Sequence, residues 1–302
     1  MTDPAITVIV PGLDVAPYVP AALDSLRRQT RSDWRAVLVD DGSVDATGDL
    51  FADAAARDDR FQVVRQPRTR GLGAARNAGL DLVTTPFVGF LDADDEFTPR
   101  ALERMIGTLE RTGSDFVIGA YTRLRPEADG TYREGSVQPW VVAATAPERH
   151  RVRLSEHPAA TGSIVAWAKV SRAHVWDTLR FPEGRLYEDQ VVAQRMLVSA
   201  TAFDTIPDVV VRWRMRPDGS SITQRESDLT VLRDCLDAMA AGLEVLADHD
   251  GAYRARRDLI HAMDLPRLRG IAANHPDPQY RDLLRAFEAR LDHVATDDTD
   301  RV

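Results

Sequence analysis

Short apolar runs alternate with amphipathic helical stretches between residues 6 and 121, and this alternation limits the fold more than any other feature of the chain. Residues 6–10 are a β-branched run, and residues 18–29 follow with apolar side chains on one helical face. Strands that alternate with helices build a mostly parallel sheet with helices on both faces. The sequence therefore predicts an α/β fold.

The predicted strands cover residues 6–10, 35–39, 61–64, 87–91 and 116–121. The predicted helices between them cover residues 18–29, 46–57 and 72–82, and a fourth begins with Thr98 as its cap and Pro99 at its first position. The pattern breaks down at residues 123–153, where Pro, Gly and charged residues are interspersed. From residue 226 to 294 the apolar spacing is helical again, which predicts a helical C-terminal segment.

Two of the predicted strands end in acidic clusters, at residues 40–41 and 92–96. In α/β sheets, ligands lie outside the carboxyl ends of the strands, so both clusters should face one crevice. Asp92 and Asp94 are two residues apart and share a face in extended backbone. Carboxylate oxygens favour a hard divalent cation, Mg²⁺ or Mn²⁺, completed by water and substrate phosphate. A solvated turn is the alternative.

Other ligand-binding motifs fail by their spacing. The acids at 92–96 are not followed by the glycine of an EF-hand loop, and GLGAAR has Arg76 where a dinucleotide fingerprint has its third glycine. Lys169, the only lysine among 38 basic residues, lies in WAKV and not in a phosphate-binding loop. A single cysteine, Cys235, excludes an internal disulfide, and helix packing is its expected role.

The overall charge and the hydropathy pattern exclude further classes. A net charge of −9 argues against binding to nucleic acid. No apolar run approaches the roughly 18 residues of a membrane-spanning helix. The first six residues lack the basic start and the apolar core of a signal peptide. These patterns predict a cytoplasmic protein without a transmembrane segment.

Six stretches in order give the chain a family resemblance. They are TVIVPGLDVAPYVPAALDSLRRQT, VLVDDGSVDATGDL, RGLGAARNAGL, FVGFLDADDEF, FPEGRLYEDQVVAQRML and RPDGSSIT. Over roughly residues 5–223 the chain resembles the family 2 glycosyltransferases, which have the Rossmann-like GT-A fold. The resemblance implies a catalytic domain at residues 1–223, with a nucleotide-sugar half at about 1–122 and an acceptor half at about 123–223. Residues 224–302 would then be a helical C-terminal segment.

The resemblance implies roles for the nucleotide-binding residues. Pro11, Gly12 and Asp14 would line the nucleobase pocket, although Gly12-Leu13-Asp14 departs from the Thr-Tyr-Asn of many relatives. Asp41 would accept a hydrogen bond from the uracil N3–H, and Arg76 would lie against the nucleotide. Simpler roles stay open, because Asp41 is also placed to cap the next helix and Arg76 to lie on a helix surface.

The resemblance also implies the catalytic residues. Asp92 would contact the ribose or the metal, and Asp94 the metal. In the acidic pair Glu188-Asp189, Asp189 would be the general base, although an acid at a helix N-terminus also interacts favourably with the helix dipole. The residues of the loop near the diphosphate include Arg216 and Ser220.

The implied activity is the inverting transfer of a sugar from a UDP-sugar to an acceptor hydroxyl, with Mn²⁺ or Mg²⁺. The chain is similar to bacterial enzymes that act on wall teichoic acid and other surface polymers. This similarity suggests a glycan or a polyol-phosphate polymer as acceptor, at the inner face of the membrane. The C-terminal helices would pack on the catalytic domain, bind acceptor or pair subunits in a homo-oligomer. A non-catalytic nucleotide-sugar scaffold and a nucleotidyltransferase are the alternatives.

Overall fold

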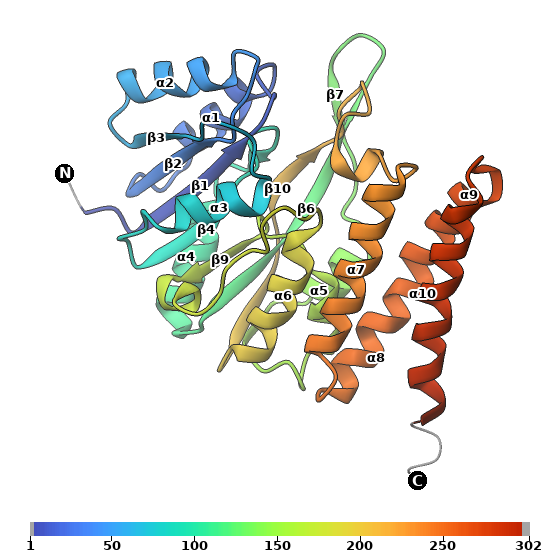
Figure 1. The fold of residues 1–302 in the computed structure, drawn as a ribbon. Coiled ribbons are helices and arrows are strands. Elements are labelled where there is room, and N and C mark those ends of the chain that lie inside the picture. Colours follow the sequence, from blue (N-terminus) through green and yellow to red (C-terminus); the bar gives the residue numbers. More distant parts are fainter. Residues whose placement is uncertain (1–2, 298–302) are drawn as a thin grey trace.

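Figure 1 shows a computed structural model that describes residues 3–297, with side chains described up to Leu291. The strands are β1 Ile6–Gly12, β2 Trp34–Asp40, β3 Phe61–Arg65, β4 Phe87–Phe90, β5 Glu96–Phe97, β6 Phe116–Pro126, β7 Tyr132–Glu134, β8 Arg149–Val152, β9 Lys169–Arg172 and β10 Phe203–Arg214. The helices are α1 Val19–Arg27, α2 Thr47–Arg57, α3 Leu72–Leu80, α4 Ala101–Thr112, α5 Pro139–Thr145, α6 Glu188–Ser199, α7 Leu229–Val245, α8 Asp250–Leu259, α9 Leu265–Asn274 and α10 Pro278–Asp297. Four short turns are also helical, namely η1 Pro158–Gly162, η2 Ala173–Trp176, η3 Ile222–Gln224 and the π-helical η4 Ile260–Asp264.

The strands of the described chain form one mixed sheet in the order β3-β2-β1-β4-β9-β6-β10-β5, with β7 beside β6 and β8 beside β10. The pairs β1–β2, β1–β4 and β2–β3 are parallel, as the alternation of strands and helices predicts. β9 lies antiparallel between β4 and β6. It comes from the segment after residue 153, so the N-terminal alternation gives no sign of it.

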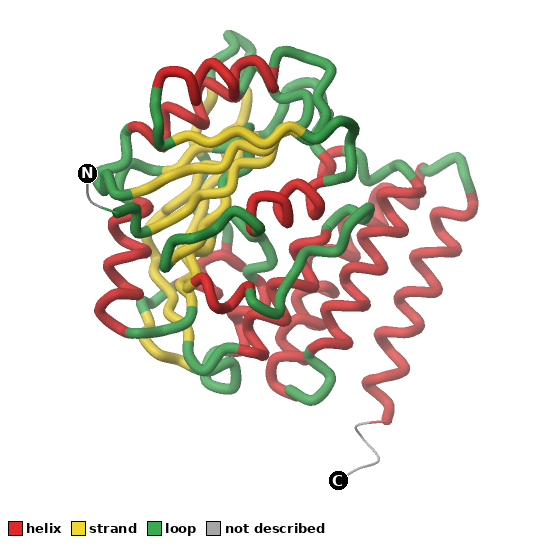
Figure 2. The backbone as a smooth tube through the Cα atoms, turned by 60° about the vertical axis from the view of Figure 1, so that its left-hand side comes forward, coloured by secondary structure: helices red, strands yellow, loops and turns green. Residues whose placement is uncertain are grey.

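Helices cover both faces of the sheet, and Figure 2 shows the strands between them. α1, α2 and α4 lie on one face, while α3, α5 and α6 lie on the other. All seven residues of β1 are buried, because a central parallel strand is covered on both sides. Because β1 is parallel to both β2 and β4, the carboxyl ends of these three strands meet at one edge of the sheet.

The C-terminal helices form a second apolar core and pack on the acceptor half. α7 lies along α6, and α8 lies against η1. Cys235 is buried in this core, which confirms its predicted packing role. Among the described residues, no helix is long and apolar enough to cross a membrane. The members of this core are Leu232, Cys235, Leu236, Met239, Leu243, Ile260, Leu265, Leu268, Ala272, Tyr280, Leu284, Phe287 and Leu291.

The predicted end of β1 and the predicted cap of α4 were wrong, and β6 continues to Pro126, beyond its predicted end at residue 121. β1 continues through Pro11 and Gly12. Proline has no N–H to donate, but the pairing of β4 with β1 ends at Phe90, so no partner strand needs a hydrogen bond from Pro11. Thr98 does not cap α4, which begins at Ala101. Its hydroxyl donates to the Val209 carbonyl of β10 instead, 2.7 Å away.

Candidate active site

Backbone hydrogen bonds join three strand ends into one surface. The N–H of Asp41, just after β2, donates to the Gly12 carbonyl at 3.0 Å. The N–H of Ala93, just after β4, donates to the Pro11 carbonyl at 3.1 Å. The end of β1 thus lies between the two acidic clusters, and the structure brings them to one edge as the sequence predicts.

Asp41 holds the turn that precedes α3. Its two carboxylate oxygens accept the N–H groups of Arg70 and Gly71, both at 2.9 Å, and the side chain is 3% exposed. Burial raises the pKa of Asp41, and the two N–H groups oppose that shift. Asp41 does not cap α2, so the capping alternative is wrong. Each oxygen keeps a lone pair with which it can accept another donor.

A glycine brings the turn after β2 close to the turn that precedes α3. Gly42 has φ 79°, and a Cβ there would lie 2.7 Å from the carbonyl carbon of Arg68. Asp14, with φ 50°, is fixed beside them because its Oδ1 accepts the Val44 N–H at 2.8 Å. The close approach at Gly42 needs a residue without a side chain and with left-handed backbone.

Arg76 connects the acid of β4 to the acid of α6. Its Nη2 donates to Asp92 Oδ1 at 2.8 Å, and its Nη1 donates to Glu188 Oε1. The guanidinium also lies 5.3 Å from the ring centroid of Phe181. Arg76 is 1% exposed, so the surface-helix alternative is wrong. Segments that are distant in sequence thereby share one buried ionic network.

Arg216 forms an ion pair with the next acid of the cluster, Asp94. Its Nε and Nη2 donate to Asp94 Oδ2 at 2.8 and 2.6 Å. Its Nη1 lies 3.3 Å from the hydroxyl oxygen of exposed Ser220, and its carbonyl accepts from Gln224. The ion pair between Arg216 and Asp94 thus holds the predicted diphosphate loop next to the end of β4.

Arg214 fixes the turn that carries Asp94. Its N–H donates to Asp95 Oδ1 at 2.7 Å, its Nε to the Asp94 carbonyl at 2.9 Å, and its Nη2 to Glu96. Burial raises the pKa of Asp95 well above its ordinary value, and the neighbouring acids add to this shift. Sequence analysis missed Arg214, because no motif marks it.

The carboxylates fit a divalent cation only with help from a substrate. Asp92 Oδ2 and Asp94 Oδ1 accept no hydrogen bond from another described residue. No cluster of three or more His, Cys, Asp or Glu residues suited to a metal occurs in the described part of the chain. Two carboxylates leave most positions of an octahedral ion open, which water and diphosphate oxygens would have to fill.

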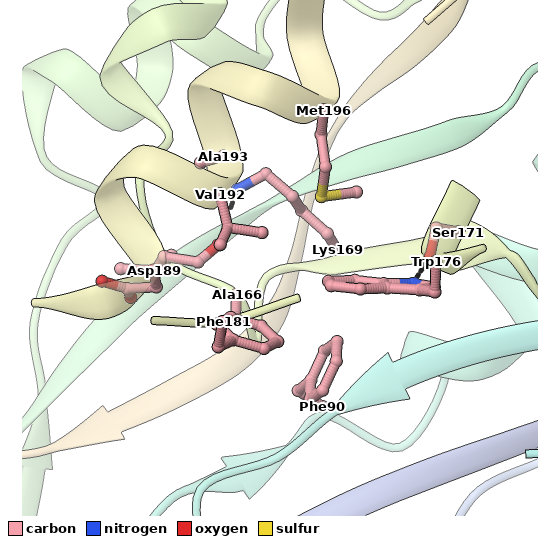
Figure 3. Close-up of a pocket in the computed structure, with 11 residues that line it drawn as sticks. Phe90, Ala166, Lys169, Ser171, Trp176, Phe181, Asp189, Val192, Ala193 and Met196 are labelled. Atoms are coloured by element: carbon pink, nitrogen blue, oxygen red, sulfur yellow. Dashed lines mark hydrogen bonds between the residues drawn. The ribbon is translucent and has the colours of Figure 1, made fainter. Parts of the chain in front are cut away.

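Glu188 and Asp189 begin α6 but lie in different surroundings. Glu188 is 3% exposed and bonded to Arg76, whereas Asp189 is partly exposed. Burial raises the pKa of Glu188 to about 7, against the effect of Arg76. Burial also raises the pKa of Asp189, while Arg76 and then Lys169 oppose the shift and Asp92 adds to it. Figure 3 shows Asp189 at a small cavity whose lining also includes Lys169 and Phe181.

An aromatic group lies on the same face as α6. The ring of Trp167 is 4.7 Å from that of Tyr121 and 6.2 Å from that of Trp213. Arg123 lies 4.8 Å from Trp213 and 5.6 Å from Trp140, and its buried Nε has no hydrogen-bond partner among the described residues.

Comparisons with known proteins extend these observations. A model of glycosyl transferase family 2 matches residues 7–167. The chain is 28% identical to the glycosyltransferase GlyA of Streptococcus pneumoniae over 82% of its length, and 30% identical to the putative glycosyltransferase EpsH of Bacillus subtilis over 74%. It spans 35% of GlyA and 64% of EpsH.

Solved structures share the fold at lower identity. S. aureus TarS in complex with UDP-GlcNAc superposes with a TM-score of 0.68 and 18% identity, covering 89% of this chain and 74% of TarS. The mannosyltransferase PcManGT of Pyrobaculum calidifontis, in complex with GDP-Man and Mn²⁺, gives 0.56 and 18%, covering 100% of this chain and 89% of its own. These matches confirm the expected GT-A fold. The family model covers more than half of the chain, including the strand ends that carry both acidic clusters, and the chain belongs to glycosyl transferase family 2.

Proposed function

We propose that the protein transfers a sugar from a UDP-sugar to an acceptor hydroxyl with inversion at the anomeric carbon. The observation that carries this proposal is the network in which Arg76 links Asp92 to the first turn of α6. This network supports the proposal because it joins Asp92, the proposed donor-side acid, to the helix that begins with Glu188 and Asp189. Nucleotide sugars bound to TarS and PcManGT, which share the fold, support the donor class.

On the donor side, Asp92 and Asp94 would hold Mn²⁺ or Mg²⁺ together with the diphosphate. The cation would neutralise charge that builds on the leaving diphosphate. Asp41 is the proposed acceptor of the uracil N3–H, beside Pro11, Gly12 and Asp14. Arg216 and Ser220 lie on the loop that would contact the diphosphate once Arg216 leaves Asp94.

On the acceptor side, Asp189 is the proposed general base. Its carboxylate takes the proton of the acceptor hydroxyl while the hydroxyl oxygen forms the new bond to the anomeric carbon. The bond between that carbon and the diphosphate oxygen breaks on the opposite face, which inverts the configuration. Asp189 must be ionised for this step, and the positive charges of Arg76 and Lys169 favour the ionised form. Glu188 is bonded to Arg76 and would orient the first turn of α6.

We further propose a hydroxyl-rich acceptor, such as a glycan or polyol-phosphate polymer, that lies against the aromatic residues beside α6. Trp213 and Arg123 offer a stacking face and a positive charge there. A domain boundary near residue 223 stays a prediction, because the first apolar core also includes Leu246 and Ala252 beyond that residue. Cytoplasmic location at the inner membrane face and pairing through the C-terminal helices stay predictions.

A panel of nucleotide sugars with Mn²⁺ tests the function. The correct donor should raise the melting temperature by mass action, and UDP should be released when acceptor is added. Donor hydrolysis without acceptor separates an enzyme from a scaffold, which would bind donor and leave it intact. Release of pyrophosphate would identify a nucleotidyltransferase instead. Failure of every nucleotide sugar to bind would refute the proposal.

A further inference from the structure

Lys169 is the only lysine of this chain, and it lies in the middle of the sheet. It begins β9 between β4 and β6 and is 3% exposed. The other basic residues of the 38 are all arginine. The mechanism proposed above gives Lys169 no contact with substrate, so its burial requires another explanation.

The hydrogen bonds of Lys169 explain why arginine would not fit. Its Nζ donates to the carbonyls of Ser163 and Val165 at 2.7 and 2.6 Å, and to the Ser163 hydroxyl at 3.1 Å. An ammonium group has three donors arranged around a point, and all three are used here. A guanidinium is planar and larger, and it presents five donors in a fixed fork. The pocket therefore selects the ammonium group.

The loop that Lys169 binds forms the wall beside Asp189. Val165, Ala166 and Lys169 line the same cavity as Asp189 (Figure 3). The next residue of the loop, Trp167, packs on Tyr121. Without the three hydrogen bonds, the loop at residues 163–167 would lose its attachment to Lys169. This loop lies where the proposed acceptor would approach Asp189.

Lys169 also contributes positive charge to the surroundings of Asp189. It makes no ion pair within the described residues, and burial lowers its pKa to about 7 while Asp189 opposes that shift. The charged groups that act on Asp189 are Arg76 and Lys169 as cations and Asp92 and Glu188 as acids. Arg76 is already bonded to both of those acids. Lys169 is the cation near Asp189 that is not committed to another carboxylate.

We propose that Lys169 is a positioning residue, which holds residues 163–167 as the wall of the acceptor pocket and supplies an uncommitted positive charge beside the Asp189 carboxylate. This proposal rests on the function proposed above, because it assigns a role within the same acceptor site. It concerns residues that lie outside the donor-binding strand ends. Donor binding should therefore be independent of Lys169.

A single lysine makes the electrostatic part directly measurable. Protein labelled with ¹⁵N-lysine gives one side-chain Nζ signal, which should titrate near pH 7. Asp189→Asn removes a negative charge that favours the ammonium form, so the pKa of Lys169 should fall further. Asp53→Asn, an exposed acid on α2, is the control and should leave the titration in place. An identical titration in parent and Asp189→Asn protein would overturn the proposal.

Kinetics test the positioning part. Lys169→Met keeps the length of the side chain and removes the charge and the three bonds, so the acceptor kcat/KM should fall at least about tenfold. The acid limb of the pH–rate profile should move to higher pH, because loss of a cation raises the pKa of Asp189. Lys169→Arg should not restore activity. Ser171→Ala, which alters the same cavity through its bond to Trp176, should leave the acid limb in place.

The outcomes separate this proposal from the proposed function. An unmoved acid limb in Lys169→Met, or a loss of donor affinity equal to the loss of transfer, contradicts a positioning role. If the parent protein transfers no sugar, the proposed function fails, and the NMR titration still decides whether Lys169 and Asp189 interact. If Lys169→Met does not fold, the titration of the parent and Asp189→Asn proteins decides the electrostatic part, and the kinetics of Lys169→Arg, which keeps the charge, decide the positioning part.

Discussion

Arg216 should compete with a divalent cation for Asp94. Two of its nitrogens donate to Asp94 Oδ2, and both side chains are 16% exposed. A hydrogen bond between charged groups contributes about 1.5–3 kcal/mol, and solvent at a partly exposed pair reduces this value. We therefore assign about 1–2 kcal/mol to the pair.

Arg216→Ala removes this competitor. Because 1.4 kcal/mol corresponds to tenfold in affinity, Mn²⁺ should bind the variant roughly tenfold more tightly than the parent when no nucleotide is present. With UDP the effect should reverse, since the loop loses a positive charge for the diphosphate. Calorimetric titrations of Mn²⁺ alone, UDP in chelator, and UDP with Mn²⁺ measure all three affinities.

Arg212→Ala is the matched control. Arg212 lies near the end of β10, four residues before Arg216, but it pairs with Glu134 at 2.8 Å and does not contact Asp94. The control removes the same charge from a nearby position in the chain, so it accounts for long-range electrostatics. If Mn²⁺ binds Arg216→Ala no more tightly than Arg212→Ala, the ion pair does not occupy a metal position and the reasoning is refuted.

Four further outcomes are expected. Asp189→Asn should lower single-turnover transfer by roughly 10²–10⁴ without changing donor affinity, and loss of donor binding would contradict its role as base. Asp41→Ala should weaken UDP binding about tenfold or more and lower the melting temperature, because the N–H groups of Arg70 and Gly71 lose their acceptor. CDP, which lacks the N3–H, should bind poorly to the parent, and equal calorimetric affinities would exclude Asp41 as the base-reading group. The pKa of Asp189 is raised above its ordinary value of about 4, so transfer should fall as the pH drops through this raised pKa and the base becomes protonated. A kcat/KM profile that stays flat down to pH 4 would count against the assignment.

The nucleotide half of the fold was predictable because its information is local. Each of the first four strands is an apolar run, and each helix between them has an apolar face, so composition and spacing are sufficient. β9 was not predictable in this way. It has four residues and is buried by pairing with β4 and β6, which are distant in sequence. Its place depends on tertiary contacts that periodicity does not contain.

The acids of the site were predictable, and their partners were not. Asp92 and Asp94 follow an apolar strand, so their position at the sheet edge comes from topology alone. Arg216 pairs with Asp94 from 122 residues away, and Glu188 pairs with Arg76 from 112 residues away. The family resemblance marks Arg76 and Arg216, but in a chain with 38 basic residues the sequence gives no reason to pair either of them with a particular acid.

These pairings change how the acidic clusters should be understood. The charges of the acids near β4 are balanced within the protein, because Arg76, Arg214 and Arg216 form ion pairs with them. Arrival of a divalent cation with a diphosphate would then be an exchange of partners, in which Arg216 leaves a carboxylate and gains a phosphate. Arg76 is 1% exposed and bonded on both sides, so it should remain in place during that exchange. The exposed loop of Arg216 would move while the buried link between Asp92 and α6 stays fixed, which keeps Asp189 oriented as the donor binds.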